Sequence, residues 1–196
     1  MKATALVACL LSLAVMLGWA APTQAAYEFN MGIHGAKQGW FKPENATKGG
    51  LPCLGFQLAA ESLRDAQSGL PTGRRQYSPL TVTRAWGPSS PQIFEAFATD
   101  EPLPEVTFDF PVVGPNGTAS VAYTIKLTNA TIIGVTYHLE PAVQPPALQR
   151  LLEDVSFSFQ KIQVTTVNGG VTAEDTLGGS ATLAPGHLFL PGTLPR

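Results

Sequence analysis

The sequence predicts a mainly β protein, made of antiparallel strands with one short α-helix. Nearly every apolar segment after residue 26 alternates with polar residues at the two-residue period that is typical of a half-buried strand. Only one segment, Ser89–Thr99, carries the signals of a helix. The chain has 196 residues, and those beyond the first 25 are enough for one domain with a sizeable core.

The first 25 residues have the three regions of a secretory signal. Lys2 supplies a positive charge, Ala5–Ala21 form an almost unbroken apolar run, and Pro22 ends that run ahead of small residues. We expect cleavage between Ala25 and Ala26, so the mature chain is exported to the periplasm or outside the cell. The apolar run is shorter than the ~20 residues that span a bilayer, so no membrane association is expected after cleavage.

The two cysteines lie in different parts of the chain. Cys9 ends a short lipobox-like sequence and is an alternative cleavage and acylation site, but the apolar run continues well beyond it. Export leaves Cys53 as the only thiol, which excludes a disulfide within the chain. We therefore expect Cys53 to be a small buried apolar residue, with an intermolecular disulfide as the alternative.

The charge balance excludes some partners. The formal net charge is −2, and loss of Lys2 with the signal makes it −3. No basic face for nucleic acid or for an anionic membrane is indicated. Charged residues make up 13% of the chain, against ~25% in an ordinary soluble protein. A surface with so few charges is suited to contact with other protein.

Three strands are expected before the helix, at Tyr27–Ile33, after a loop that ends at residue 50, and at Pro79–Trp86. The second strand is expected to face inward through Leu54, Phe56 and Leu58, with Ala60 as a further candidate. Between the second and third strands, Ser62–Ser78 is polar and shows neither the strand nor the helix period. This segment is interpreted as a long loop.

The helix signals lie together in one segment. Ser89 and Gln92 have the spacing of a capping box, and Pro91 falls in the first turn. Ile93, Phe94 and Phe97 lie on one helical face, and the residues 100–102 end the element. A helix this short is unstable alone, so we expect that face to pack on the sheet at one end of a barrel.

The strand pattern is strongest after the helix. A hairpin is predicted whose inward residues are Val106, Phe108, Phe110, Val112, Val121, Tyr123, Ile125 and Leu127. Further strands follow at Ile132–Leu139 and through Val155, Phe157 and Phe159. Past Gln160 the apolar positions change parity, which indicates a bulge or a strand that moves from one sheet to another. Residues 168–196 are rich in glycine and proline and are expected to form a tail.

Four of these segments carry a resemblance when taken in order. They are Ser89–Thr99, Glu105–Val112, Tyr123–Ala130 and Leu152–Thr165. Their order and spacing over Tyr27–Val167 resemble the haemolysin-coregulated protein (Hcp) family, although each motif alone suits any β-barrel. The chain then divides into a signal at 1–25, an Hcp-like β-barrel domain at 26–167 and the tail at 168–196.

The resemblance implies a small antiparallel β-barrel with one short helix, which assembles into homo-hexameric rings. In the family these rings stack into the tube of type VI secretion, and protein effectors travel inside it. The loop Ser62–Ser78 is similar to the loop that reaches the neighbouring ring. The residues expected to act there are Arg64, Arg74, Arg75, Gln76 and Tyr77. The family has no catalytic residues, and no cofactor or metal is implied.

A secretory signal departs from this family, whose tube subunits fold and polymerise in the cytoplasm. We therefore favour a structural, self-assembling subunit that is exported, with a type VI tube subunit and effector carrier as one alternative. A protein cargo or a surface partner is possible for either. The role of the tail is left open.

An enzyme is not indicated by the residues themselves. The histidines, His34, His138 and His187, have no metal-ligand spacing. The acidic residues occur as adjacent pairs such as Glu174-Asp175, which point to opposite faces of a strand and form no catalytic dyad.

A secreted binding module for a glycan or small ligand is the other alternative. Its stacking platforms would be Trp40, Phe41 and Trp86. For Trp86, packing against the helix is the competing interpretation.

Overall fold

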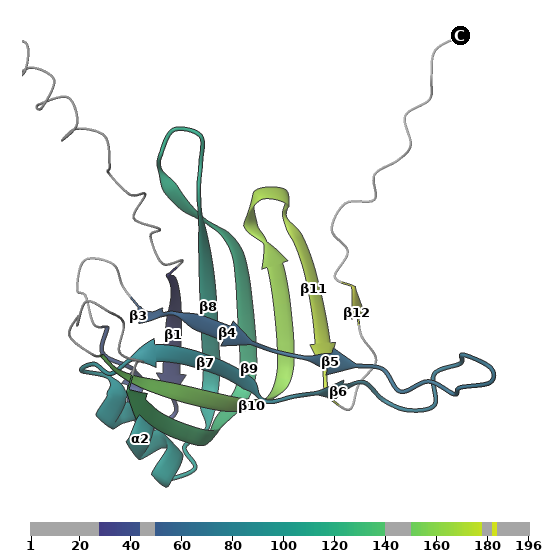
Figure 1. The fold of residues 1–196 in the computed structure, drawn as a ribbon, viewed down its shortest axis with the longest axis horizontal. Coiled ribbons are helices and arrows are strands. Elements are labelled where there is room, and N and C mark those ends of the chain that lie inside the picture. The colour runs from purple at the N-terminus through teal and green to yellow at the C-terminus, as the bar shows by residue number, and fades with distance from the viewer. Residues whose placement is uncertain (1–27, 44–49, 140–149, 178–181, 184–196) are drawn as a thin grey trace, which may run out of the picture.

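The computed structural model describes residues 28–43, 50–139, 150–177 and 182–183 (Figure 1). The predicted signal with Cys9, the cleavage site at Ala25 and Ala26, and His187 in the tail lie outside the described residues.

The described residues form mostly strands, as the sequence predicts, with one α-helix. The first strands are β1 (Phe29–Gly35), β2 (Gly39–Trp40), β3 (Leu51–Cys53), β4 (Gly55–Gln57), β5 (Ala60–Glu61), β6 (Gln76–Tyr77) and β7 (Leu80–Ala85). Helix α2 (Ser90–Ala98) follows. The remaining elements are β8 (Leu103–Val113), β9 (Ala119–Leu139), β10 (Leu151–Thr166), the short helix η1 (Val167–Gly169), β11 (Val171–Thr176) and β12 (Thr182–Leu183).

The strand pairing closes on itself. Antiparallel hydrogen bonding leads from β1 to β8, β9, β10, β7 and β4 in turn. Only Leu54 separates β4 from β3, and β3 pairs with β1. The path therefore returns to the strand where it began, which is the pairing of a small antiparallel barrel. The fold class predicted from the sequence is confirmed.

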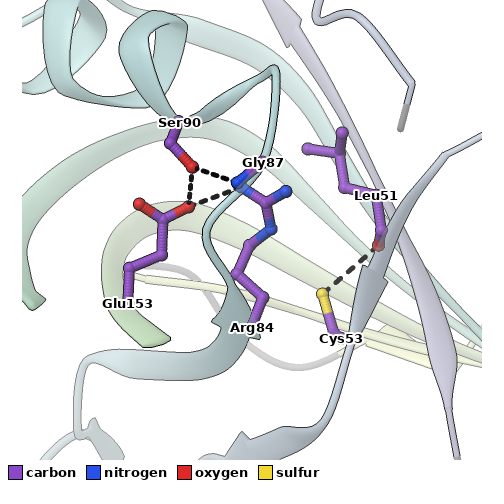
Figure 2. A network of polar contacts seen from close by, with 6 residues as sticks. All are labelled: Leu51, Cys53, Arg84, Gly87, Ser90 and Glu153. Atoms are coloured by element: carbon purple, nitrogen blue, oxygen red, sulfur yellow. Dashed lines mark hydrogen bonds and ion pairs between the residues drawn. The ribbon is translucent and has the colours of Figure 1, made fainter. Parts of the chain in front are cut away.

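One apolar core fills the space inside this ring of strands. It joins inward residues of the barrel strands with residues of α2, all of them buried. Its largest members include Met31, Phe108, Phe157, Ile93 and Leu127. Cys53 belongs to it with 0% exposure, as expected for a small buried apolar residue, and its thiol donates to the Leu51 carbonyl at 3.4 Å (Figure 2). Helix α2 lies against one end of the barrel (Figure 1).

The second strand bends, and this corrects its predicted orientation. Leu51 and Cys53 are the buried residues of β3, whereas the predicted inward residue Leu54 is only half-buried and lies at the bend. Beyond the bend, Phe56 and Leu58 pack against the core as predicted. The bend lets one short segment pair with β1 through its first half and with β7 through its second.

Helix α2 begins where the sequence places it, but two details differ. The Ser89 side chain makes no capping hydrogen bond, so the capping box does not form. The buried stripe of the helix is Ser90, Ile93 and Ala96, and Phe94 is 52% exposed. Positions i, i+3 and i+6 follow one face of a helix, and Phe94 falls beside that face.

Strands β9 and β10 are long because each belongs to two parts of the molecule. The first half of β10 pairs with β9 and β7, and its second half pairs with β9 and β11. The inward positions change parity between Phe159 and Ile162, the step that the sequence indicates. Opposite that step, Asn129 of β9 has a φ of 50°, a conformation that asparagine tolerates better than most residues.

The sheet also extends into the segment that the sequence assigns to the tail. β11 pairs with β10 over six positions, from Lys161 opposite Thr176 to Thr166 opposite Val171. The β8–β9 and β10–β11 hairpins both project past the other barrel strands (Figure 1). Residues 171–176 of the predicted tail therefore belong to the sheet.

Candidate functional site

An arm formed by residues 59–78 projects sideways from the barrel (Figure 1). At its base β5 pairs with β6, with Ala60 opposite Tyr77 and Glu61 opposite Gln76. Farther out, Arg64 and Pro71 form a bridge. The segment interpreted as a long loop is therefore an irregular hairpin, whose short pairs explain why its sequence shows no two-residue period.

The outer end of the arm is a turn organised by Asp65. Its Oδ1 accepts hydrogen bonds from the backbone of Gln67 and Ser68 at 3.1 and 2.7 Å and from the Ser68 hydroxyl at 2.8 Å. These bonds lower the pKa of Asp65, the backbone of Ser68 most of all. Gly69 has a φ of 66°, which favours glycine at the end of the turn. Asp and Gly at this spacing are a turn signal that the sequence carries.

The base of the arm is held against β11 by one carboxylate. Arg75 Nε and Nη2 lie 2.6 and 2.8 Å from the two carboxylate oxygens of Asp175. The Tyr77 hydroxyl donates to the same carboxylate at 2.7 Å. The Arg75 hydrogen bond lowers the pKa of Asp175 more than burial raises it, with Tyr77 adding to the lowering. We call these three residues the clamp.

The structure places the five residues predicted to reach a neighbouring ring in different environments. Arg75 and Tyr77 are in the clamp, and Gln76 is in β6. Arg64 donates to the Gly69 carbonyl at 3.1 Å within the arm. Arg74 is exposed and makes no hydrogen bond or ion pair with another residue among those the structure describes. Asp175, which completes the clamp, lies in the predicted tail, and its place in the sequence gives no sign of this role.

The projecting hairpins continue the apolar face of the core into solvent. The pairing places Phe108, Ile125, Val164 and Ala173 in one row across β8–β11, and Phe110, Tyr123, Thr166 and Val171 in the next. The exposed fractions are 50% for Tyr123, 44% for Val164 and 63% for Val171. We call Tyr123, Ile125, Val164 and Val171 the open face. The inward face of the β8–β9 hairpin is buried near the barrel, as predicted, but it is exposed at the outer end of the hairpin.

A buried polar cluster joins α2 to the barrel (Figure 2). Arg84 of β7 and Glu153 of β10 are both 0% exposed, with Nη1 and Oε1 2.5 Å apart. The same Oε1 accepts from the Ser90 hydroxyl at 2.8 Å, and Ser90 Oγ accepts from the Gly87 amide at 2.9 Å. This cluster fixes the start of α2 on the barrel strands, so its role is structural.

A second buried carboxylate fixes the turn after β1. Glu101 Oε1 accepts from the backbone amides of Lys37 and Gln38 at 2.6 and 2.9 Å, and Oε2 accepts from the Gln38 side chain at 3.0 Å. Burial raises the pKa of Glu101, but these hydrogen bonds outweigh it and leave the pKa below its ordinary 4.5. A Cβ on Gly35 would lie 2.5 Å from Glu101 Oε1, so glycine is needed for this close approach.

The aromatic residues proposed as ligand platforms do not form one site. Phe41 is buried in the core, and Trp86 stacks on Tyr137 of β9 with ring centroids 5.1 Å apart. Trp40 lies beside His34 and borders a hollow of about 320 Å³ on the outer side of β1.

The described residues carry neither a metal-binding cluster nor a membrane-spanning helix. Among the described residues, no three His, Cys, Asp or Glu side chains lie close enough to hold a metal ion. His34 contacts Trp40, and His138 Nδ1 lies 3.6 Å from Asp154. In the part of the chain that the structure describes, no helix has both the length and the apolar character needed to cross a membrane.

Comparisons with known proteins agree on one family. A family model described as "Type VI secretion system effector, Hcp" matches residues 33–166. A curated relative, "Major exported protein" of Pseudomonas aeruginosa, is 32% identical over 122 residues, which is 62% of this chain and 71% of the relative.

Solved structures share the fold at lower identity. A "Crystal structure of Hcp protein" aligns with a TM-score of 0.68 at 22% identity, over 76% of this chain and 99% of that one. Hcp1 of E. coli EAEC 042, in a mutant form, gives 0.67 at 19% identity over 77% and 99%. "Secreted protein Hcp3 from Pseudomonas aeruginosa" gives 0.60 at 23% identity over 76% and 98%.

Proposed function

This chain belongs to the Hcp family, and we propose from that membership that it is a structural subunit of type VI secretion. In this proposal the chain assembles with copies of itself into hexameric rings, and the rings stack into tubes. The family match carries the proposal, because residues 33–166 take in the arm, α2 and most of the barrel. The match favours a structural role over a catalytic one. It does not favour the glycan-binding alternative, and the burial of Phe41 also argues against that alternative.

The open face is the surface that we assign to contact between copies within a ring. Its residues continue the rows of the buried core, yet water reaches them in the single subunit. Apolar area buried against another copy contributes about 25 cal/mol per Å². Such contact is little weakened by salt, unlike contact between exposed charges.

Light scattering of the purified mature protein tests the ring. We expect the mass of a hexamer in both low and high salt, and the double variant Tyr123→Ser, Val171→Ser should be a monomer. The control is Leu139→Ser, which removes a 60% exposed side chain from the other end of β9. A wild type that stays monomeric at micromolar concentration, or a control that dissociates equally, would contradict the proposal.

The arm is the element that we assign to contact between stacked rings. Leu63 and Leu70 are 46% and 65% exposed, and Arg74 has five guanidinium donors to offer to carboxylate or carbonyl groups of another copy. We expect the variant Leu70→Ser, Arg74→Ser to form rings but no tubes in negative-stain images. Gln67→Ala, at the exposed tip, is the control and should form both.

Export is proposed from the signal-like first 25 residues, with the name of the P. aeruginosa relative in support. A chain exported by such a signal assembles outside the cytoplasm, which is the point where this proposal departs from the family pattern. Mass spectrometry of the native protein should place its N-terminus at Ala26 or within a residue or two of it. An intact Met1, or a lipid on Cys9, would contradict export by this route. Protein cargo inside the ring remains part of the proposal and is tested by co-purification with the assembled form.

A further inference from the structure

Asp175 stands out because of the row that it occupies. The pairing places Val106, Leu127, Ile162 and Asp175 side by side across β8–β11. The three apolar members are 0%, 0% and 4% exposed, and Asp175 is 9% exposed. A carboxylate at the end of an apolar row is costly to bury unless charged and hydrogen-bonding partners reach it.

The partners that reach it come from the arm. Arg75 meets both carboxylate oxygens with two nitrogens, at 2.6 and 2.8 Å, in the planar fork geometry that gives directional pairing. Tyr77 adds its hydroxyl at 2.7 Å, and its ring lies edge-on to Phe159 of β10 with centroids 5.6 Å apart. Position 75 is 100 residues away from position 175.

Two hydrogen bonds between Ala59 and Ser78 hold the strands of the arm to each other at this end. The Ser78 amide donates to the Ala59 carbonyl and the Ala59 amide donates to Ser78 Oγ, each at 2.9 Å. These bonds leave the direction of the arm relative to the sheet undetermined. The clamp supplies that direction, because it joins β6 to β11 through groups that fit at one angle.

We therefore infer that Asp175 is a positioning residue: it fixes the direction in which the arm leaves the barrel, and so presents the arm tip to a second copy of this chain in one orientation. An arm that is already oriented loses less conformational freedom when it binds. The assembly part of this inference rests on the proposed function, whereas the positioning within one subunit does not.

Limited proteolysis measures directly how often the arm opens. Trypsin cuts after arginine, and Arg64 and Arg74 lie in the exposed part of the arm. When opening is fast compared with cleavage, the cutting rate follows the population of the open arm. Asp175→Asn should raise the cleavage rate after these residues about tenfold or more, the effect expected from losing a charged hydrogen-bond network. Cleavage elsewhere in the chain should not change.

Glu174→Gln is the matched control. Glu174 precedes Asp175 on the same strand, points to the other face, and pairs with Lys161 at 2.7 Å. This variant also removes one charge from β11, but it should leave the arm as resistant as in the wild type. Arg75→Gln removes the other partner of the same contact. It replaces Asp175→Asn in this test if Asp175→Asn does not fold.

Assembly is the second readout. The concentration at which rings stack into tubes should rise about tenfold for Asp175→Asn and stay unchanged for Glu174→Gln. Equal cleavage of the wild-type arm and the Asp175→Asn arm, or equal effects of the two variants, would overturn the inference. If the wild type never assembles, the proposed function fails, and the cleavage comparison still decides whether Asp175 positions the arm.

Discussion

Two arginine–carboxylate pairs join distant parts of this chain, and they differ in how much water reaches them. Arg84 and Glu153 are both 0% exposed, beneath the start of α2. Arg75 and Asp175 have side chains 42% and 12% exposed, at the base of the arm. The first pair lies inside the barrel, where removal of one partner leaves a buried charge that has lost its ion pair. In the second pair Arg75 is well exposed to water, although Asp175 is nearly buried.

The difference in exposure predicts different roles for the two pairs, one in barrel stability and one in arm orientation. Breaking a fully buried pair costs several kcal/mol, since the remaining charge has no water around it. Breaking a pair with one exposed partner costs less, because the exposed charge regains its hydration. The buried pair should therefore govern whether the barrel folds, and the clamp should govern where the arm points.

The largest effect is expected for Glu153→Gln. Removing one partner of the buried pair should lower the free energy of unfolding by about 3–5 kcal/mol, measured by urea denaturation. The double variant Arg84→Met, Glu153→Leu should be milder than the single one, because both charges leave the interior together. A single variant as stable as the wild type would show that water reaches this site.

An intermediate effect is expected from acid. The pKa of Asp175 is lowered, mainly by the hydrogen bond from Arg75, so its contribution to stability is present above the ordinary value of 3.8 and is lost as the pH falls below it. The difference in melting temperature between the wild type and Asp175→Asn should therefore shrink in that range. A difference that is constant with pH would mean that the ionised carboxylate contributes nothing.

Glu101 should add to the acid sensitivity. Its pKa also lies below the ordinary 4.5, because the hydrogen bonds from Gln38 and Lys37 outweigh the effect of burial. The pH dependence has the same direction as for Asp175. The contribution of Glu101 to stability is present above that value and disappears as the pH falls below it. Glu101→Gln should show a flatter dependence of melting temperature on pH than the wild type between pH values of about 5 and 3.

The smallest effect is expected for Lys126→Gln. Lys126 and Glu105 pair at 2.7 Å across β8 and β9, but their side chains are 37% and 33% exposed. An exposed pair contributes about 0.2–1 kcal/mol and less in high salt. The free energies of unfolding of the variant and the wild type should converge when salt is raised to about 1 M. A loss of unfolding free energy as large as that for Glu153→Gln would show that burial does not set the strength of these pairs.

The barrel could be predicted from the sequence because its information is local. Alternation at positions such as Val106 and Phe108 fixes which face of a strand is inside, and the signals around Ser89 and Pro91 mark the start of the helix. The same alternation misled at the outer end of the hairpin. Tyr123 and Val121 continue the apolar period, yet they are exposed because none of the described elements covers them.

The clamp could not be predicted, since its partners are unrelated in sequence. An adjacent Glu174-Asp175 pair has the appearance of any solvated turn or tail. Only the register of β11 on β10 shows that Asp175 shares a face with Ile162 and that Arg75 reaches it. The bend at Leu54 was missed for a similar reason, because it depends on which strand each half of the segment pairs with.

The path of strand pairing has a consequence for the rate of folding. The β8–β9 and β10–β11 hairpins join neighbours in sequence, but β7 meets β10 across the chain, as in the Arg84–Glu153 contact between residues 69 positions apart. Pairs so far apart form only after a large loss of chain entropy, and proteins rich in such pairs fold in milliseconds to seconds. The barrel cannot close until β10 has been synthesised. A nascent chain of this sequence should thus keep its apolar strands unpaired for most of its synthesis, because β10 begins only at Leu151.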